Sequence, residues 1–364
     1  MSRQRPRVLL VIGLLGGGGA ERQLALFAER ARHLVDLGGF IVNPGGVWDG
    51  HVRAQLARVY DAKATSRAGK LAAFARAVLR DRPDVIHCWH TAPAIYPLLT
   101  WPMHRRPVVV NIRAMLTRST DSGAPKLQPS ARLLRFASAT VANSQHLFDD
   151  LEGAGLHAPA PLVVPNGIVV PEQAALHTSS ADAPLRIAAI GTLKPLKNWA
   201  QLLRVTARLR QAGRAVETTI YGEGPDRAAL TSLATWLGLD PARTLPGFSA
   251  NIAEDLRQHD LLVHASHTEG QPNAVLEALA CGLPAVTSAL PACVALQAQG
   301  DFVRTFAVDD DDGCIAALSP WLTDTAARQR AGAAGRAHVI ANFGVDTMAA
   351  RYVALYRSLA ARAR

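Results

Sequence analysis

The chain has 364 residues, of which 49% are hydrophobic and 19% are charged. This composition suits two globular domains of ordinary size and excludes a disordered chain, and no apolar stretch reaches the length of a membrane helix. The net charge of +10 lies in the first half, since residues 1–170 hold 21 Lys and Arg against 11 Asp and Glu and the remainder holds 18 of each. A basic half favours an anionic membrane surface or an anionic acceptor. The basic segments lack interleaved aromatic residues, so we expect no nucleic-acid partner; arginine-rich composition without any partner is the alternative.

An apolar run follows the basic N-terminus. Residues 8–15 predict a buried first strand rather than a signal peptide, because a glycine run and a charged amphipathic segment follow instead of a small-residue cleavage site. Four glycines at 16–19 then lead into residues 20–30, which are apolar at helical spacing. A strand, a glycine loop and a helix N-terminus present backbone amides to an anion. The loop matches neither Gly-x-Gly-x-x-Gly nor a Walker motif, so it predicts neither a dinucleotide nor ATP.

Strand and helix signals then alternate: strands at 39–42, 83–90 and 107–113, and a helix at 68–80. Strand 83–90 carries His87 and His90 at its carboxyl edge, the edge where open α/β sheets bind ligands. The two imidazoles point to opposite sides of a regular strand, so only one is expected to line a site. We favour His90, which lies further into the loop, but the sequence leaves the choice between His87 and His90 open. A metal site here would lack a third ligand.

The middle of the chain contains a polar stretch without periodicity at 115–129, interpreted as a loop. The Ala-, Ser- and Thr-rich residues 171–184 are predicted to be a linker. The second half opens with a strand from 185 that runs into a basic loop and a helix from 199. A further strand ends in the Gly222-Glu-Gly-Pro turn, and a helix is predicted at 253–259. The regular alternation of strands and helices predicts an α/β fold with parallel sheets.

One stretch combines a phosphate-type site with two carboxylates. The apolar run 260–265 predicts a buried strand and 275–281 a helix, which places Glu269 at the end of the strand and Glu277 in the helix. Amides and a helix N-terminus suit phosphate, whereas carboxylates accept hydrogen bonds from hydroxyls. A nucleotide sugar has both kinds of group. The alternative is that Glu277 is a surface residue and Glu269 a helix cap.

The last part of the chain offers little further chemistry. The acidic run at 309–312 is interpreted as part of a solvated loop rather than a metal site, and 326–338 and 345–359 are predicted to be amphipathic helices. The cysteines form no Cys-x-x-Cys pair and lie in apolar surroundings, so we expect reduced, buried thiols: Cys88, Cys281, Cys293 and Cys314.

The Glu269-Gly-Gln-Pro-Asn-x-x-x-Glu277-Ala-x-Ala-x-Gly-x-Pro stretch resembles the nucleotide-sugar-binding signature of the retaining glycosyltransferases of family 4. The resemblance implies the GT-B fold: two Rossmann-like parallel-sheet domains facing across a cleft, with a C-terminal helix that crosses back to the first domain. The implied parts are an acceptor-binding domain at 1–170, the linker 171–184, a nucleotide-sugar-binding domain at 185–344 and the crossover helix 345–364. Residues 139–144 and 162–168 resemble the last two strands of the family's first domain, and the loop 115–129 is interpreted as specific for the acceptor.

The same resemblance implies the reaction and its setting. A retaining, metal-independent enzyme would move a sugar from a nucleoside diphosphate sugar to a glycan acceptor, expected to be lipid-linked, in bacterial surface polysaccharide or glycoconjugate synthesis. It would need no cofactor. The expected reduced cysteines and the basic first half add the expectation of a cytoplasmic protein that is peripheral at the inner face of the plasma membrane. A nucleotide-sugar epimerase or glycan phosphorylase of the same fold, and a catalytically silent GT-B partner subunit, are the alternatives.

The family's functional positions carry over to residues of this chain. His90, Glu269 and Lys197 are the implied catalytic residues, and Glu21 and Arg113 are weaker candidates for acceptor binding. The family's diphosphate-binding arginine is Thr192 here, a departure that removes a positive charge, which Lys194 is expected to supply. No residue is assigned to a metal. The implied donor-binding set is Gly18, Gly19, Thr192, Lys194, Lys197, Gly222, Arg227, Glu269, Gly270, Gln271, Pro272, Asn273 and Glu277.

Overall fold

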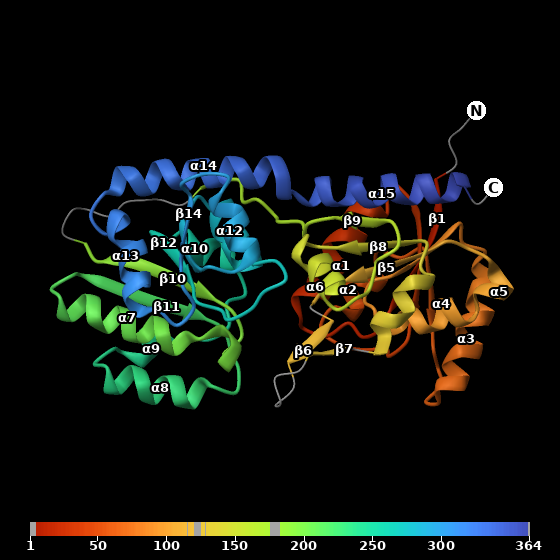
Figure 1. The fold of residues 1–364 in the computed structure, drawn as a ribbon, viewed down its shortest axis with the longest axis horizontal. Coiled ribbons are helices and arrows are strands. Elements are labelled where there is room, and N and C mark those ends of the chain that lie inside the picture. The colour runs from red at the N-terminus through yellow and green to blue at the C-terminus, as the bar shows by residue number, and fades with distance from the viewer. Residues whose placement is uncertain (1–4, 115, 120–124, 128, 175–182, 363–364) are drawn as a thin grey trace. The chain divides into compact units, whose positions relative to one another are not determined.

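The computed structural model describes residues 5–114, 116–119, 125–127, 129–174 and 183–362 (Figure 1). The chain divides into two compact units: unit 1 comprises Met1–Gly167 and Val345–Arg364, and unit 2 comprises Ile168–Gly344. Each unit is built on one parallel sheet with helices on both faces. The predicted α/β class with two parallel sheets is therefore confirmed.

Unit 1 contains a seven-stranded parallel sheet in the order β3-β2-β1-β4-β5-β8-β9. Side chains alternate along each strand, so both faces of this buried sheet are apolar. In the first strand Val8 and Leu10 join one core and Leu9 and Val11 the other. The strands are β1 (Arg7–Ile12), β2 (Asp36–Ile41), β3 (Arg58–Asp61), β4 (Val85–Cys88), β5 (Val108–Ile112), β8 (Ala139–Ala142) and β9 (Pro161–Val163).

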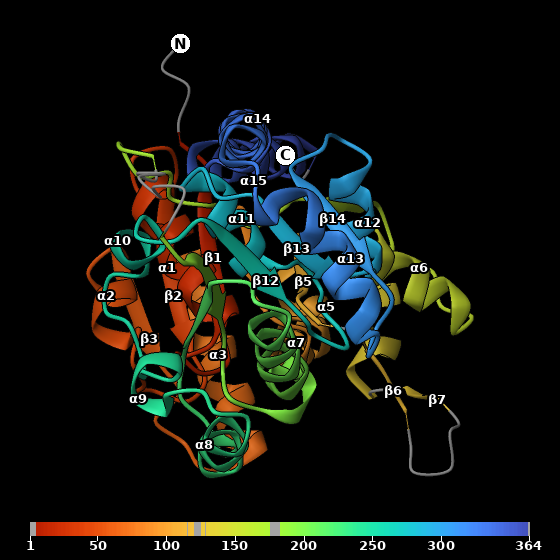
Figure 2. The same cartoon turned by 90° about the vertical axis from the view of Figure 1, so that its left-hand side faces the viewer.

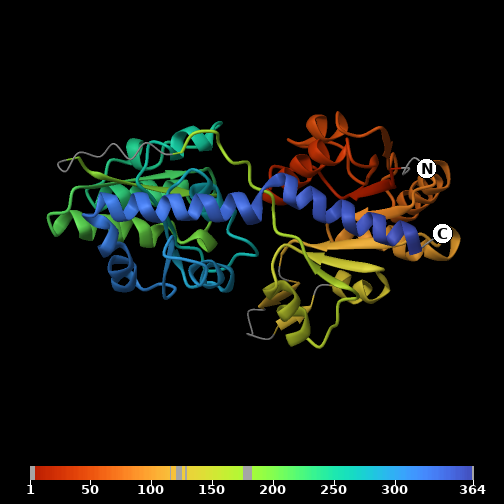
Figure 3. The same ribbon diagram turned by 90° about the horizontal axis from the view of Figure 1, so that it is seen from above.

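The C-terminal helix of the chain belongs to unit 1. Helix α15 (Val345–Arg362), the dark blue helix that ends at the C label in Figure 3, packs beside α1 (Gly19–Ala31). Tyr352 lies edge-on to Phe27 with ring centroids 5.1 Å apart. The predicted crossover helix is thereby confirmed. The remaining helical elements of unit 1 are α2 (Asp49–Arg53), α3 (Arg67–Asp81), η1 (Ala92–Ala94), α4 (Ile95–Leu99), α5 (Trp101–His104), η2 (Pro129–Phe136) and α6 (His146–Gly153).

Unit 2 contains a five-stranded parallel sheet in the order β11-β10-β12-β13-β14. Its strands are β10 (Leu185–Ile190), β11 (Val216–Tyr221), β12 (Leu261–His264), β13 (Ala285–Ser288) and β14 (Val303–Phe306). One face packs against α7 (Trp199–Gln211) and α13 (Asp311–Leu322), and the other against α10 (Ile252–Leu256), α11 (Asn273–Ala280) and α14 (Thr325–Phe343) (Figure 2). The other helical elements are η3 (Pro195–Lys197), α8 (Arg227–Trp236), α9 (Pro241–Thr244) and α12 (Pro291–Gln297).

The structure differs from the sequence prediction at the boundary between the units. The predicted first domain ended at residue 170, but Ile168 already packs in a core of unit 2, and its amide donates to the carbonyl of Phe343 at 2.7 Å. Arg336 donates to the carbonyl of Pro171, so the start of the predicted linker also lies on unit 2. Residues 175–182 of that linker lie outside the described residues.

The polar stretch 115–129 also differs from its prediction as a loop without secondary structure. Two short antiparallel strands, β6 (Thr117–Ser119) and β7 (Pro125–Leu127), pair within it, while 115, 120–124 and 128 lie outside the described residues. Strands of three residues are too short to show an alternation of apolar and polar residues, so the sequence pattern could not predict them.

Two other expectations concern buried thiols and membrane helices. All four cysteines are free and buried, as predicted. Within the described part of the chain, no helix combines the length and the apolar character needed to cross a bilayer.

Candidate active site

Each sheet has a topological switch point. At this point the chain continues from one strand to its neighbour on one side and later returns to pair with the same strand on its other side. In unit 2, β11 lies on one side of β10 and β12 on the other; in unit 1, β2 and β4 flank β1 in the same way. Ligands of open α/β sheets bind beyond the carboxyl ends of the strands at such points. The loops after these strands carry predicted site residues: Lys197 after β10, Glu269 after β12, Gly18 after β1 and His90 after β4.

Glu269 is held at the switch point of unit 2 by three side chains. The Nζ of Lys197 donates to its Oε1, and the two side chains are only 20% and 17% exposed. Ser266 Oγ donates to the same oxygen at 3.1 Å, and His264 Nε2 lies 3.2 Å from it. The structure thus brings together the two predicted residues Lys197 and Glu269. His264 and Ser266 escaped prediction because they lie in and after an apolar strand whose polar residues carried no motif.

These contacts fix the charge of the carboxylate. Burial alone would raise the pKa of Glu269, but the hydrogen bonds and charges of His264 and Lys197 outweigh it and lower the pKa to about 2. Glu269 is therefore ionised at neutral pH. An ionised carboxylate accepts hydrogen bonds from hydroxyls and stabilises nearby positive charge, but it does not act as a general acid.

The loop that carries Lys197 is braced from several sides. Trp199 Nε1 donates to the carbonyl of Thr192 at 3.1 Å, and Asn198 adopts a left-handed conformation with φ of 53° before α7 begins. Asn198 Nδ2 donates to Asp309 Oδ1 at 2.8 Å, and His267 Nε2 lies 3.0 Å from the same oxygen. Asp309 therefore ties together the loops that follow β10 and β12.

The acidic run at 309–312 is largely exposed to solvent, as interpreted, but it is only partly a loop, because its last two residues begin α13. Asp310 caps α13 by accepting from the amide of Gly313 at 2.8 Å, and α13 begins at Asp311. Asp311 and Asp312 pair with Arg204 and Arg208 of α7. Each carboxylate has a partner in the protein, and among the described residues no group of three His, Cys, Asp or Glu side chains could hold a metal ion.

The glycine turn after β11 lies against the main chain of the loop after β10. A methyl group on Gly222 would overlap the carbonyl oxygen of Gly191, and the amide of Leu193 donates to the carbonyl of Glu223 at 3.0 Å. Arg227 donates to the carboxylate of Glu223 at 2.6 Å and to the carbonyls of Gly222 and Leu245 at 3.3 and 3.0 Å. Gly222 and Arg227 therefore shape this edge of the sheet, where the side chains of Thr192 and Lys194 are exposed.

The remaining residues predicted to bind the donor lie in the loop before α11 and in the first two helical turns of α11. Gln271 and Pro272 are buried, Gly270 is half-buried, and α11 begins at Asn273. Glu277 lies in the second turn of α11 and is half-buried. Burial, and to a smaller extent the negative charge of Glu277, raise the pKa of the Cys281 thiol to about 12, so Glu277 lies near this thiol.

In unit 1, His90 lies beside the N-terminus of α1. Its Nε2 is 3.5 Å from Glu21 Oε1, and the Glu21 carboxylate lies over Gly18, the residue before α1. Trp89 Nε1 donates to the carbonyl of Ala20 at 2.8 Å, which fastens the loop after β4 to the same helix end. Gly18, Gly19 at the start of α1, Glu21 and His90 thus meet at one point.

His87 and Arg113 take part in a buried network with α15. His87 Nδ1 lies 2.6 Å from the Tyr356 hydroxyl and its Nε2 lies 2.9 Å from Asn111 Oδ1. Arg113 donates to Asn166 Oδ1 at 2.6 Å and to the Tyr352 hydroxyl at 3.0 Å, and its guanidinium lies 4.2 Å from the ring centroid of Trp89. This network could not be predicted from sequence, because its tyrosines lie more than two hundred residues further along the chain.

Both histidines are neutral at neutral pH. Burial, and then the charge of Arg113, lower the pKa of His90 to about 4. Burial lowers the pKa of His87 to about 3, although its hydrogen bond with Asn111 acts in the other direction.

Acid should therefore destabilise the protein through His87 and His90. Because their folded-state pKa values lie below the ordinary value of about 6.5, the unfolded chain binds protons first as the pH falls below 6.5. Each histidine should then lower the free energy of unfolding by about 1.4 kcal/mol per pH unit down to its folded-state pKa. Between pH 7 and pH 4.5, urea unfolding should show that the free energy of unfolding falls less steeply for His90→Gln than for the parent. The control His33→Gln changes an exposed residue and should lose stability as steeply as the parent does. Equal slopes for His90→Gln and the parent would contradict the burial of a neutral His90.

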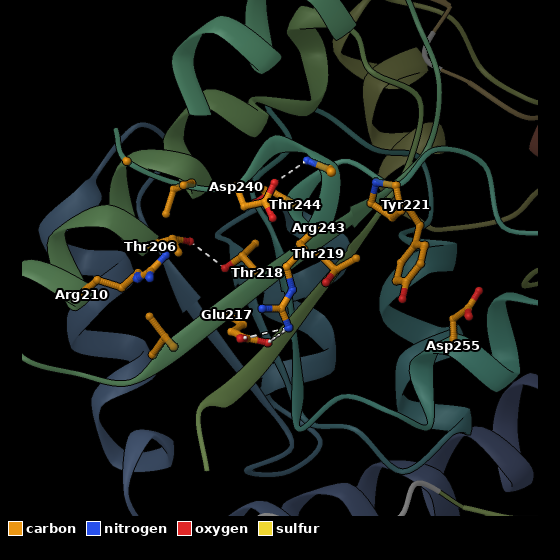
Figure 4. A pocket seen from close by; sticks show the side chains of 15 residues that line it. Thr206, Arg210, Glu217, Thr218, Thr219, Tyr221, Asp240, Arg243, Thr244 and Asp255 are labelled. Carbon is orange, nitrogen blue, oxygen red and sulfur yellow. Dashed lines mark hydrogen bonds and ion pairs between the residues drawn. The ribbon is translucent and has the colours of Figure 1, made fainter. Parts of the chain in front are cut away.

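A pocket of about 560 Å³ lies along β11 in unit 2 (Figure 4). Thr206 and Arg210 of α7, the outer side of β11 and the segment 238–246 line it. Glu217 and Arg243 pair within it at 3.3 Å. None of the residues predicted to bind the donor lines this pocket.

Comparison with known proteins identifies both halves of the chain. Residues 17–170 match the family model described as Glycosyltransferase Family 4, and residues 184–324 match the model described as Glycosyl transferases group 1. Together the two matches cover well over half of the chain.

Two curated bacterial relatives illustrate the similarity. A putative glycosyltransferase, EpsF of Bacillus subtilis, is 32% identical over 127 residues, which are 35% of this chain and 33% of EpsF. An N-acetylgalactosaminyltransferase of Campylobacter jejuni, named for an acceptor on diphospho-undecaprenol, is 30% identical over 144 residues, 39% of each chain. The matched part spans between a third and two thirds of the length of the curated relatives.

The fold has close structural counterparts. The crystal structure of Anabaena HepE in complex with UDP and glucose superposes with a TM-score of 0.80 at 19% identity, covering 97% of this chain and 100% of that one. On the two family matches and this shared architecture, the chain belongs to the family 4 glycosyltransferases and has the GT-B fold.

Proposed function

We propose that this protein is a retaining, metal-independent transferase that moves a sugar from a nucleoside diphosphate sugar to a lipid-linked glycan in the synthesis of a bacterial surface glycoconjugate. In this proposal unit 2 binds the donor and unit 1 the acceptor. The observation that carries it is the pairing of Lys197 with Glu269 at the switch point of unit 2. One group suits departing negative charge and the other suits sugar hydroxyls and developing positive charge.

The donor class is supported by chemistry and by similarity. Lysine has three N–H donors, so Lys197 can keep its bond to Glu269 while another N–H reaches a phosphate oxygen. The three described contacts of Glu269 all use Oε1, which leaves Oε2 for hydroxyls of the sugar. HepE, which shares the fold, was solved with UDP and glucose. We therefore propose a UDP-sugar as the first donor to test.

The proposed reaction breaks the bond between the anomeric carbon and the diphosphate. Positive charge develops on the sugar and negative charge on the leaving group, so the site must stabilise both more strongly as the bond lengthens. Within unit 2, Lys197 and Lys194 would stabilise the diphosphate, and Glu269 the sugar. The acceptor hydroxyl would attack from the face that the diphosphate leaves, with a phosphate oxygen taking its proton.

His90 and Glu21 would serve the acceptor side in this proposal. A neutral imidazole can donate one hydrogen bond and accept another, which suits a sugar hydroxyl. Arg113 would act on the acceptor less directly, because its guanidinium is engaged by Asn166, Tyr352 and Trp89.

Glu277 is proposed to hold the ribose hydroxyls of the donor. Glu277→Ala should raise the donor Kd and KM about tenfold or more, because a bidentate acceptor for two hydroxyls is lost, while kcat at saturating donor should change less. Isothermal titration with the donor and steady-state kinetics measure the two effects. The exposed Glu172 of unit 2 offers a matched control in Glu172→Ala. Unchanged donor affinity in Glu277→Ala would show that this residue does not hold the ribose.

One observation favours a second function, that of a catalytically silent partner subunit. Thr192 replaces the arginine of the family signature and supplies no charge to the diphosphate. The two functions are separated by donor turnover with purified protein and acceptor in the absence of any other protein. A same-fold epimerase would instead release free sugar without an acceptor, which product analysis detects.

The test of the proposed function has two stages. Thermal shift with UDP, GDP and ADP sugars identifies the donor, because a bound ligand stabilises the folded state by mass action. Transfer to lipid-linked glycans is then followed in buffer with EDTA, and NMR gives the anomeric configuration of the product. The proposal expects activity with EDTA present and retention of configuration. Inversion, or a strict need for added metal, would overturn it.

A further inference from the structure

The excess positive charge of unit 1 comes from one segment. Residues 62–136 hold 13 Lys and Arg against 3 Asp and Glu, which equals the net charge of the whole chain. This segment contains β4 to β7 and the helical elements α3, η1, α4, α5 and η2, of which α3, α4, α5 and η2 matter here. Several of its arginines are exposed on these elements, and within the described part of the chain they form no ion pair: Arg76, Arg80, Arg105, Arg132 and Arg135.

The same segment exposes large apolar side chains. On α4, Ile95 and Leu99 are four residues apart and therefore share a face, and they are 38% and 58% exposed. On α5, Trp101 and Met103 are 43% and 46% exposed. Phe136 at the end of η2 is 58% exposed and lies under the guanidinium of Arg135 at 4.7 Å.

These elements adjoin one another. Helix α4 contacts α3, α5 and η2, and α3, α4 and α5 lie together in unit 1 (Figure 1). We name the exposed side chains of these four elements the α4–α5 surface, which comprises Ile95, Leu99, Trp101, Met103 and Phe136 together with Arg76, Arg80, Arg105, Arg132 and Arg135.

A partner for this surface must combine negative charge with an apolar phase. An anionic leaflet does so, because its headgroups attract arginines and the acyl chains beneath them accept apolar side chains. Tryptophan favours the boundary between the two regions. Helices of five and four residues are too short to enter the hydrocarbon core, so they suit contact with the interface only.

We propose that the α4–α5 surface of unit 1 binds an anionic lipid bilayer, with Leu99 and Trp101 at the level of the headgroups and the arginines around them against anionic phosphates. The inference rests on the proposed function, because a lipid-linked acceptor is embedded in such a bilayer. It adds the part of the protein that makes the contact.

The test is sedimentation of the full-length chain with vesicles of phosphatidylcholine alone or mixed with phosphatidylglycerol. The parent should bind the anionic vesicles, bind neutral ones weakly, and be released by salt. Arg76→Gln/Arg80→Gln should lower the partition coefficient about 30-fold, at about fivefold for each arginine. Leu99→Ala/Trp101→Ala should lower it about tenfold, because less apolar surface enters the interface.

Matched controls come from unit 2. Arg214→Gln/Arg330→Gln removes two exposed arginines there, and Trp236→Ala removes a tryptophan that is 80% exposed. Both controls should bind vesicles like the parent. Equal losses in the controls and the α4–α5 variants would overturn the proposal, as would a parent that ignores phosphatidylglycerol. Circular dichroism melting verifies that each variant is folded, and the two α4–α5 variants test the surface independently.

Two further readouts separate this inference from its alternatives. If sedimentation equilibrium shows a dimer that Leu99→Ala/Trp101→Ala dissociates, the surface is an interface between copies and the proposal is overturned. Thermal shift by donor and transfer to a water-soluble acceptor should be unchanged in the α4–α5 variants. If the parent lacks those two activities, the proposed function is contradicted. If the parent is active but the α4–α5 variants bind vesicles as well as the parent does, only the assignment of the surface is contradicted.

Discussion

Glu269→Gln should lower kcat by about two to three orders of magnitude, the usual loss when a preorganised electrostatic contact to a transition state is removed. Glutamine keeps the shape of the side chain but removes the negative charge that the structure maintains with a pKa of about 2. The sugar would then lose a charged hydrogen-bond acceptor at the stage when it becomes positive. Stopped-time assays with saturating donor and acceptor measure the effect.

The same variant has a structural effect that must be separated from the chemical one. Lys197, 20% exposed, would lose its carboxylate partner, which should lower the free energy of unfolding by about 1–3 kcal/mol. Urea unfolding measures that loss, and Glu172→Gln at an exposed position of unit 2 provides the control. A folded Glu269→Gln protein with kcat near that of the parent would remove Glu269 from the reaction.

Lys197→Ala should also lower kcat by about two to three orders of magnitude, because the leaving diphosphate loses a charge-assisted hydrogen bond. Lys197→Arg should recover part of the rate, since it restores charge with a different shape. Lys63→Ala, which removes an exposed lysine of unit 1, should leave kcat unchanged.

The double variant Lys197→Ala/Glu269→Gln tests whether the two residues act as a unit. Their side chains are bonded to each other, so each single change already disturbs the other residue. The loss in the double variant should be clearly smaller than the product of the two single losses. Fully multiplicative losses would mean that the pairing has no part in the reaction.

The positions of most strands, and of Lys197 and Glu269 in the loops that follow two of them, could be predicted from sequence for physical reasons. Buried parallel strands are short runs of β-branched and aliphatic residues, and the residues that bind phosphate follow them in glycine- or proline-containing turns. Lys197 and Glu269 stand in such turns, and the structure joins them although they are 72 residues apart.

The supporting contacts could not be predicted, because they depend on tertiary neighbours. Asp309 belongs to an acidic run that looks solvated, yet it binds Asn198 and His267 from two other loops. His87 pairs with Tyr356 across 269 residues of sequence. Local periodicity carries no information on such distant partners.

The central claim is that the loops after β10 and β12 bind the nucleoside diphosphate part of the donor. Hydrogen–deuterium exchange of the full-length chain, with and without saturating UDP, tests it most directly. The account predicts slower exchange at 191–199, 222–224 and 268–277 and no change along the pocket beside β11. Protection confined to that pocket, or no protection in these loops under conditions where UDP raises the melting temperature, would contradict it.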